Sequence, residues 1–239
     1  MATQRHITTG STRWALLVGV LFLAIQSAMA PPTTLLAMPA RFATAAPDLP
    51  IDSIAVTTTA DAADGNTASF AALLSQPGAD GAVSLREALL ATSTMTTPAA
   101  LTITFGIPAS GAGYNSTENT WTITLGMQAL PALARGNVTV DGSTQPGPAT
   151  HPRIVLDGAG VYEAAGFSNG FTITSGRNTI LGLALINFYD DGVLLDGPAA
   201  AFNHIAGCFI GARPNGSAEP SASYFGIEIR AGAHDNIIG

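Results

Sequence analysis

The chain has 239 residues, of which only 10% are charged, and sixteen acidic residues outnumber nine basic ones to give a net charge of −7 at pH 7. Nucleic acid is excluded as a partner, because phosphate binding needs a basic stripe and the nine arginines form none. The single cysteine, Cys208, excludes an internal disulfide framework. Its apolar neighbours predict a small buried side chain.

The start of the chain, residues 1–30, has the features of a signal peptide. Two arginines precede an apolar run from Trp14 to Ile25, and small residues follow up to Ala30. Twelve apolar residues are too few to cross about 30 Å of hydrocarbon as a helix, so the run predicts export. Two prolines directly after Ala30 disfavour cleavage there, which leaves later cleavage or an uncleaved anchor open. Residues 31–50, rich in Ala, Pro and Thr, predict a flexible spacer.

One helix is predicted over residues 83–92. Ser84 and Glu87 have the spacing of a capping box, in which the hydroxyl accepts from the amide three residues on and the carboxylate accepts from the amide of the cap. Leu85, Ala88 and Leu89 share one face at helical spacing. Such a helix suits the open end of a strand stack, where apolar side chains and strand edges need cover.

Residues 54–92 resemble the CSLREA domain found near the N-termini of exported bacterial β-helix proteins. The sequence Ser84-Leu85-Arg86-Glu87-Ala88 matches the motif, and Val83 stands where the family usually has cysteine. The resemblance implies an N-terminal cap over residues 51–100, with Ser84, Arg86 and Glu87 as its structural residues. It also implies a secreted or cell-surface location and a carbohydrate-facing or adhesive role.

Several strands are predicted after this cap. Alternating apolar residues bounded by Gly, Pro or Asn occur at residues 101–105, 120–125, 137–140 and 153–156. The pairs Asp141-Gly142 and Asp157-Gly158 close two of these strands. They are expected as turns, with a calcium site as the alternative.

One pattern then repeats three times. Its Gly-led segments begin at Gly170, Gly192 and Gly226, and its Asn-led segments begin at Asn178, Asn203 and Asn236. In both series the second interval is longer than the first by the length of a short insertion. The longer interval contains residues 213–221, whose composition predicts a loop bulging from a regular coil.

The repeat predicts a parallel β-helix over residues 101–239, in an all-β chain. Apolar residues at alternate positions fill the interior, and Gly and Asn are expected at corners that need left-handed backbone. Asparagines at matching corners are expected to stack into a ladder. Residues 170–239 are similar to the right-handed β-helix regions of pectate-lyase-like proteins. A β-sandwich or another all-β fold remains the alternative.

Four residues are candidates for ligand binding. Tyr189, Asp190 and Asp191 directly precede the second Gly-led segment, and Arg213 follows it. A polysaccharide lyase needs a base and a cation, for which Arg177 and Arg230 are further candidates. A glycoside hydrolase needs two opposed carboxylates, and Asp191 and Asp196 are the pair to test.

No catalytic, cofactor-binding or metal residue is assigned from the sequence. His151, His204 and His234 have no metal-ligand spacing and are expected at turns or on the surface. The sequence therefore favours a structural or adhesive module that faces an extracellular polysaccharide or cell-surface glycan. An enzyme acting on acidic polysaccharide is the alternative. Because no polar terminal repeat follows Asn236, further coils or a partner are expected to cover the last coil.

Overall fold

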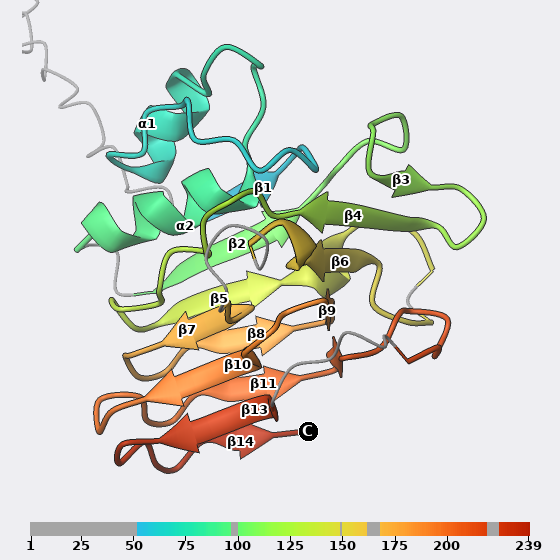
Figure 1. Ribbon diagram of the computed structural model, residues 1–239. Coiled ribbons are helices and arrows are strands. Elements are labelled where there is room, and N and C mark those ends of the chain that lie inside the picture. The colour runs from blue at the N-terminus through green and yellow to red at the C-terminus, as the bar shows by residue number, and fades with distance from the viewer. Residues whose placement is uncertain (1–51, 97–99, 149, 162–167, 219–224) are drawn as a thin grey trace, which may run out of the picture. The chain divides into compact units, whose positions relative to one another are not determined.

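The computed structural model describes residues 52–96, 100–148, 150–161, 168–218 and 225–239 (Figure 1). All of them belong to one compact unit, Ala45–Gly239. The predicted signal peptide and spacer lie outside the described residues, as do the last residues of the predicted loop 213–221. No helix among the described residues is both long and apolar enough to span a bilayer.

Strands dominate the described residues and confirm the predicted all-β class (Figure 1). Sheet A contains, in spatial order, β1 (Ser53–Val56), β2 (Leu101–Phe105), β5 (Val138–Asp141), β8 (Thr179–Leu181), β11 (His204–Ala206) and β14 (Ile237–Ile238). Sheet B contains β12 (Phe209–Ile210), β9 (Leu183–Ile186), β6 (Ile154–Asp157), β4 (Thr120–Thr124) and β3 (Tyr114–Asn115). Sheet C contains β13 (Phe225–Arg230), β10 (Asp191–Asp196) and β7 (Phe171–Ile173). The remaining elements are α1 (Phe70–Ser75), α2 (Leu85–Thr94) and the 3₁₀ turn η1 (Gly142–Thr144).

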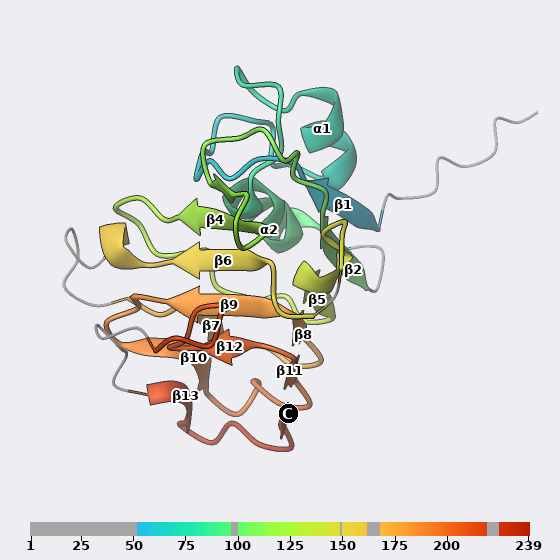
Figure 2. The same cartoon turned by 90° about the vertical axis from the view of Figure 1, so that its right-hand side faces the viewer.

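Pairing between these strands is parallel, except between β3 and β4. From β7 onward the chain visits sheets C, A and B in the same order, and each visit adds one strand beside the previous one (Figures 1 and 2). Val193 pairs with Phe171 of the preceding repeat and with Ile227 of the following one, so each residue directly after a repeated glycine is in register with the next. Residues at equivalent positions of successive sequence repeats are therefore the residues that pair on neighbouring strands.

The same register holds in sheet A. His204 pairs with Thr179 on one side and with Ile237 on the other, and each of these residues directly follows an asparagine of the Asn-led series. The extra residues of the longer interval in each series lie outside the strands, between β12 and β13.

Alternate side chains of the strands form the core. In β2, Leu101, Ile103 and Phe105 are at most 3% exposed, whereas the two threonines between them are partly exposed. Each fully buried aliphatic or aromatic side chain contributes about 1.5–3 kcal/mol relative to its exposed state. Cys208 is half-buried and packs against this core, and burial raises the pKa of its thiol.

The predicted asparagine ladder is present at the corner between sheets C and A. The backbone N–H and Nδ2 of Asn178 donate to Oδ1 of Asn203 at 2.8 and 2.9 Å. The same groups of Asn203 donate to Oδ1 of Asn236 at 2.9 and 3.0 Å. On the neighbouring strand β5, Val138 takes the ladder position and its N–H donates to Oδ1 of Asn178. The ladder satisfies buried backbone donors where the strands begin.

The left-handed corner residues differ from those predicted. The ladder asparagines do not have positive φ; the residue before each ladder position does. These residues are Asn137 (φ 52°), Arg177 (φ 62°), Phe202 (φ 60°) and Asp235 (φ 53°). The asparagine side chain is committed to the ladder, so the preceding residue makes the turn.

The repeated glycines are also required for a different reason from the one predicted. Gly170, Gly192 and Gly226 have no positive φ. A Cβ at Gly170 would lie 2.4 Å from the carbonyl oxygen of Gly192, and a Cβ at Gly192 would lie 2.6 Å from that of Gly226. Close approach of neighbouring backbones, rather than left-handed conformation, therefore excludes side chains at Gly170 and Gly192.

The predicted capping helix is confirmed as α2, with the full capping box of Ser84 and Glu87. The Glu87 carboxylate also accepts from the backbone N–H of Asp64 and Gly65 at 2.9 and 2.8 Å. The Ser84 hydroxyl donates to the Ala62 carbonyl at 2.7 Å. The two motif residues thus cap the helix and also bind the backbone of residues 62–65, which precede it.

The shorter helix α1 lies beside α2 and was not predicted from the sequence. Its Phe70 and Leu73 are buried, and Ser69 caps its first turn by accepting from the N–H of Ala72. So short a helix carries too little helical periodicity to be recognised in the sequence.

Arg86 joins two segments of the cap to the loop after β4. Its guanidinium binds the Asp61 carboxylate through two hydrogen bonds of 2.8 Å and donates to the carbonyls of Gln128 and Ala129 at 2.7 Å. Asp61 in turn accepts from the N–H of Gly126. The motif arginine therefore ties the turn after β1 to α2 and to the loop after β4.

The strands β12, β13 and β14 are the last strands of their sheets, at the end opposite α1 and α2 (Figure 1). Ile237 and Ile238 of β14 are 63% and 47% exposed, and Phe225 and Ile229 of β13 are 55% and 47% exposed. Leu195 of β10, which pairs with Ile229, is fully buried. One end of the strand stack is thus covered by helices, and the other presents strand edges and apolar side chains.

Candidate functional site

Three of the four sequence candidates lie around the start of β10. Tyr189 is 37% exposed, Asp190 is half-buried, and Asp191 is the buried first residue of the strand. Arg213 lies in the loop after β12, where its N–H donates to the Ser217 carbonyl. The same loop extends toward the β3–β4 hairpin, because the Asn215 amide donates to Glu118.

The backbone around Asp191 is fixed by the segment that leads into β7. Its N–H donates to Oδ1 of Asn169 at 3.0 Å, and its carbonyl accepts from the N–H of Gly170 at 2.9 Å. The N–H of Asp190 donates to the carbonyl of Ser168. These three hydrogen bonds hold the bend before β10 in one position and place the Asp191 side chain.

The carboxyl group of Asp191 is the most perturbed acid of this region. The residue is fully buried, and among the described residues neither of its oxygens has a hydrogen-bond donor. Burial is the largest cause that raises the pKa of Asp191 to about 6; the charges of Asp190 and Glu228 act in the same direction, and Arg230 acts in the opposite one. A buried carboxyl group whose oxygens have no hydrogen-bond partner favours its protonated form, so the geometry agrees with the raised pKa.

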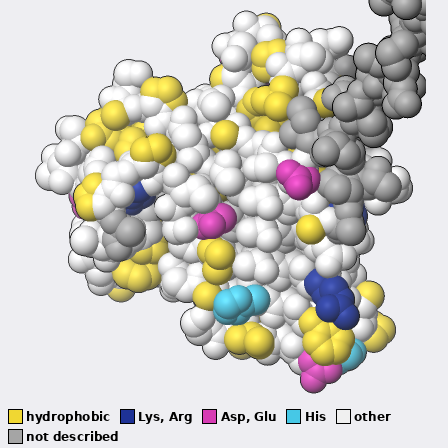
Figure 3. All heavy atoms as spheres, turned by 180° about the vertical axis from the view of Figure 1, so that it is seen from behind, with side chains coloured by type: hydrophobic (Ala, Val, Ile, Leu, Met, Phe, Trp, Pro, Cys, Tyr) yellow, Lys and Arg dark blue, Asp and Glu magenta, His cyan; other side chains and the backbone are white. Residues whose placement is uncertain are grey.

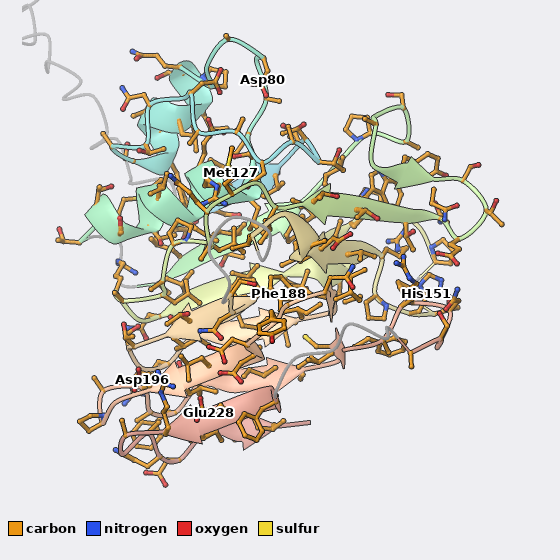
Figure 4. The ribbon with its side chains drawn as sticks, viewed as in Figure 1. Asp80, Met127, His151, Phe188, Asp196 and Glu228 are labelled. Atoms are coloured by element: carbon orange, nitrogen blue, oxygen red, sulfur yellow. The ribbon has the colours of Figure 1, made fainter. Side chains whose placement is uncertain are left out.

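Glu228 and Arg230 come from β13, the neighbouring strand. Arg230 binds Asp196 and Glu228, each at 3.1 Å, and all three side chains are partly exposed. Asp196 and Glu228 are labelled on adjacent strands in Figure 4. Sequence reasoning paired Asp191 with Asp196 and missed Glu228. The interval between the Gly-led segments was the available signal, because it places Glu228 beside Leu194 of β10.

The carboxylates of Asp191 and Asp196 do not form a hydrolase pair. They are the first and last residues of β10. An extended strand rises about 3.3 Å per residue, so their Cα atoms lie about 17 Å apart. Glycoside hydrolases place their two carboxyl groups within about 5–9.5 Å of each other.

The turn aspartates make local hydrogen bonds. Asp141 accepts from the N–H and hydroxyl of Ser143, and Asp157 accepts from Ala159 and Asn187. These contacts fit the expected turns. Across the described parts of the chain, no group of three or more His, Cys, Asp or Glu side chains is arranged to hold a metal ion.

A second cluster, which the sequence did not bring together, lies along the ladder corner. The guanidinium carbon of Arg177 lies 5.4 Å from the centre of the Phe202 ring. The Phe202 and His234 rings meet edge to face at 5.9 Å, and Nδ1 of His234 lies 2.9 Å from Asp235. Arg135, Arg177, Phe202 and His234 line a cavity of about 430 Å³. The repeat contained the signal, since Arg177, Phe202 and Asp235 each precede a ladder asparagine.

A separate groove of similar volume, about 430 Å³, lies between the turn after β1 and the loop after β2. It is lined mainly by hydroxyl-bearing and small residues, including Thr58, Thr59, Thr122 and Thr124. Such a lining offers hydrogen bonds to neutral hydroxylated ligands, and none of its residues is a cation.

Comparison with protein-family models, curated proteins and solved structures finds no match for this chain.

Proposed function

We propose that the chain folds as a helix-capped, right-handed parallel β-helix that is exported and serves as a structural and adhesive module facing extracellular glycans. The observation that supports this proposal is the order in which the strands are added. From β7 to β14 each visit to sheets C, A and B adds a strand in register with the one before, as a solenoid requires. Handedness and export rest on the sequence resemblances and on the features of residues 1–30.

The adhesive rather than catalytic role is supported by the state of Asp191. A general base must contact its substrate, and this carboxyl group is fully buried. The partly exposed acids Asp196 and Glu228 are engaged by Arg230. An adhesive module needs only side chains repeated along the stack, and the matching registers supply them.

The experiment is to offer the full chain a panel of acidic and neutral polysaccharides and to measure both binding and turnover. Unsaturated products and reducing ends report cleavage, with and without calcium. We expect binding of at least one polymer without turnover by a folded, strand-rich sample. Turnover that is lost in Asp191→Asn and kept in the matched control Asp196→Asn would contradict the adhesive role.

An enzyme acting on acidic polysaccharide is the second candidate. It is favoured by the pKa of Asp191, which at about 6 suits a base near neutral pH, and by the nearby Arg230, which suits a uronate carboxylate. In this case the cover over Asp191 has to move when substrate binds. Loss of unsaturated products in Arg230→Gln, with products retained in Arg213→Ala, would locate the lyase site on β10 and β13.

The exposed edges of β12, β13 and β14 fit the same proposal. Edge strands with exposed apolar side chains accept another strand by backbone pairing, here from a second copy of the chain. We expect the chain alone to self-associate in sedimentation velocity experiments. A monodisperse monomer with a high melting temperature would contradict this expectation.

A further inference from the structure

The cavity at the ladder corner, here called the corner pocket, has the composition of a binding site. Arg135, Arg177, Phe202 and His234 supply its large side chains, and the remaining lining is backbone and small residues of neighbouring turns. The lining residues come from the four turns that precede β5, β8, β11 and β14. Figure 3 shows basic, apolar, histidine and acidic side chains adjoining at the lower right of the rear face.

The charge of the corner pocket differs from that of the chain as a whole. The net charge of the chain is −7, yet two guanidinium groups line this cavity. Between residues that the structure describes, Arg86 pairs with Asp61, and Arg230 pairs with two carboxylates. The exposed guanidinium of Arg177 instead lies over a phenyl ring. A planar guanidinium in this position presents a fork of donors to an oxyanion.

The exposed ring of Phe202 supplies the second half of the site. It is 55% exposed, although its neighbours Ala201 and Asn203 are buried. It also has a φ of 60°, a conformation that a bulky residue rarely adopts. Asn137, at the equivalent position before β5, is a residue type that accepts this conformation more readily. An aromatic ring kept at an unfavourable backbone position and exposed to solvent is suited to packing against a ligand.

The ladder holds both side chains in place. Arg177 and Phe202 directly precede the buried ladder residues Asn178 and Asn203, and the N–H of Arg177 donates to the carbonyl of Ala201 at 3.0 Å. Backbone fixed by two adjacent rungs loses little freedom when a ligand binds. The backbone of the corner pocket is therefore preorganised, and it places the guanidinium carbon 5.4 Å from the centre of the ring.

We propose that the corner pocket binds a sugar that carries an oxyanion, either a uronate carboxylate or a sulfate ester, with Arg177 on the oxyanion and Phe202 against the apolar face of the sugar ring. His234 packs edge-on against the same phenyl ring and bounds the pocket on its far side. Asp235, bonded to His234, is the acidic group at this boundary. The inference rests on the proposed glycan-facing function and assigns it a ligand class and a site.

The test uses the full chain and three polymers, polygalacturonate, dextran sulfate and neutral dextran, with binding measured by calorimetry. Arg177→Gln removes the cation and is expected to weaken binding of an acidic polymer by about tenfold or more, since hydrogen bonds to charged groups are the strong ones. Arg41→Gln is the matched control, because it removes the same charge from the predicted spacer, none of whose residues is among those that line the corner pocket. It is expected to change affinity by less than about twofold.

A second variant separates binding from folding. Phe202→Asn places at this corner the residue type found at position 137, so the melting temperature is expected to stay level or rise. Its affinity for the acidic polymer is expected to fall by about tenfold, because the ring contact is lost. Binding of one acidic polymer only, with this pattern, supports the site and identifies the oxyanion.

Two results would overturn the inference. One is a folded chain that binds neither acidic polymer. The other is an equal loss of affinity in Arg177→Gln and Arg41→Gln, which would mean general charge attraction. Failure of the proposed function is read separately, as cleavage of a polymer or as no binding of any acidic or neutral polymer. Binding of a neutral polymer alone overturns the site and leaves the proposed function standing.

Discussion

Replacing Asn203 by alanine tests the asparagine ladder at a buried rung that is hydrogen-bonded to the rungs on both sides. Oδ1 of Asn203 accepts the N–H and Nδ2 of Asn178, and its Nδ2 donates to Oδ1 of Asn236 and to the Ser175 carbonyl. The substitution leaves the buried N–H of Asn178 without an acceptor, which costs about 1–3 kcal/mol. The other partners each keep a second hydrogen bond, so their combined loss adds about 1 kcal/mol. We expect a total loss of about 3 kcal/mol in the free energy of unfolding.

The assay is urea unfolding of the full chain followed by circular dichroism. Asn236→Ala is the matched control, because it removes the same side chain from a less buried rung. Asn236 is only partly buried, so its truncation lets water reach the N–H of Asn203, and the expected cost is about 1 kcal/mol. Equal m-values are needed for the comparison. If both variants lose the same free energy of unfolding, or Asn236→Ala loses more, burial does not determine how much the ladder hydrogen bonds stabilise the fold.

Three further predictions concern the cap, the buried acid and the repeated glycines. Arg86→Gln leaves the buried Asp61 carboxylate without its cation and is expected to lower the free energy of unfolding by about 3–5 kcal/mol, measured by urea unfolding. Retention of wild-type stability would contradict the structural role of Arg86. The pKa of Asp191 is about 6 in the folded chain, above its ordinary value of 3.8, so the folded state binds the extra proton. The stabilisation from this proton is complete below about pH 4 and is lost as pH rises through about 6. The free energy of unfolding should therefore fall by about 1–3 kcal/mol across this window in the wild-type chain, and this fall should be absent in Asp191→Asn. Gly192→Ala places a methyl group 2.6 Å from a backbone oxygen and should lower the melting temperature more than Gly197→Ala, where no atom lies within 4 Å and only positive φ is strained.

Much of the fold was predictable because its information is local or periodic. The spacings of the Gly-led segments became the register of sheet C, since equivalent residues of successive repeats must pair. The capping box was predictable for a similar reason, because Ser84 and Glu87 lie one turn apart on the same helix. The contacts of Arg86 with Asp61, Gln128 and Ala129 were not, because nothing in the sequence relates those positions.

The candidate sites were predictable only in part. The sequence indicated Asp191 as an acid of interest, but its burial and its nearness to Glu228 depend on which residues the neighbouring strands place around it. The corner pocket depends on tertiary structure even more strongly. Arg177, Phe202 and His234 come from successive repeats and meet only because their turns stack.

The sequence by itself determined the all-β class, the strand registers and the capping helix, because alternation, repeat spacing and capping are properties of neighbouring or periodic residues. Tertiary structure decided which corner residue adopts positive φ, which carboxyl group loses its solvent and which side chains meet at the ladder corner. Each of these depends on the surroundings that other repeats provide, and burial, close approach and charge act between residues that only the fold brings together.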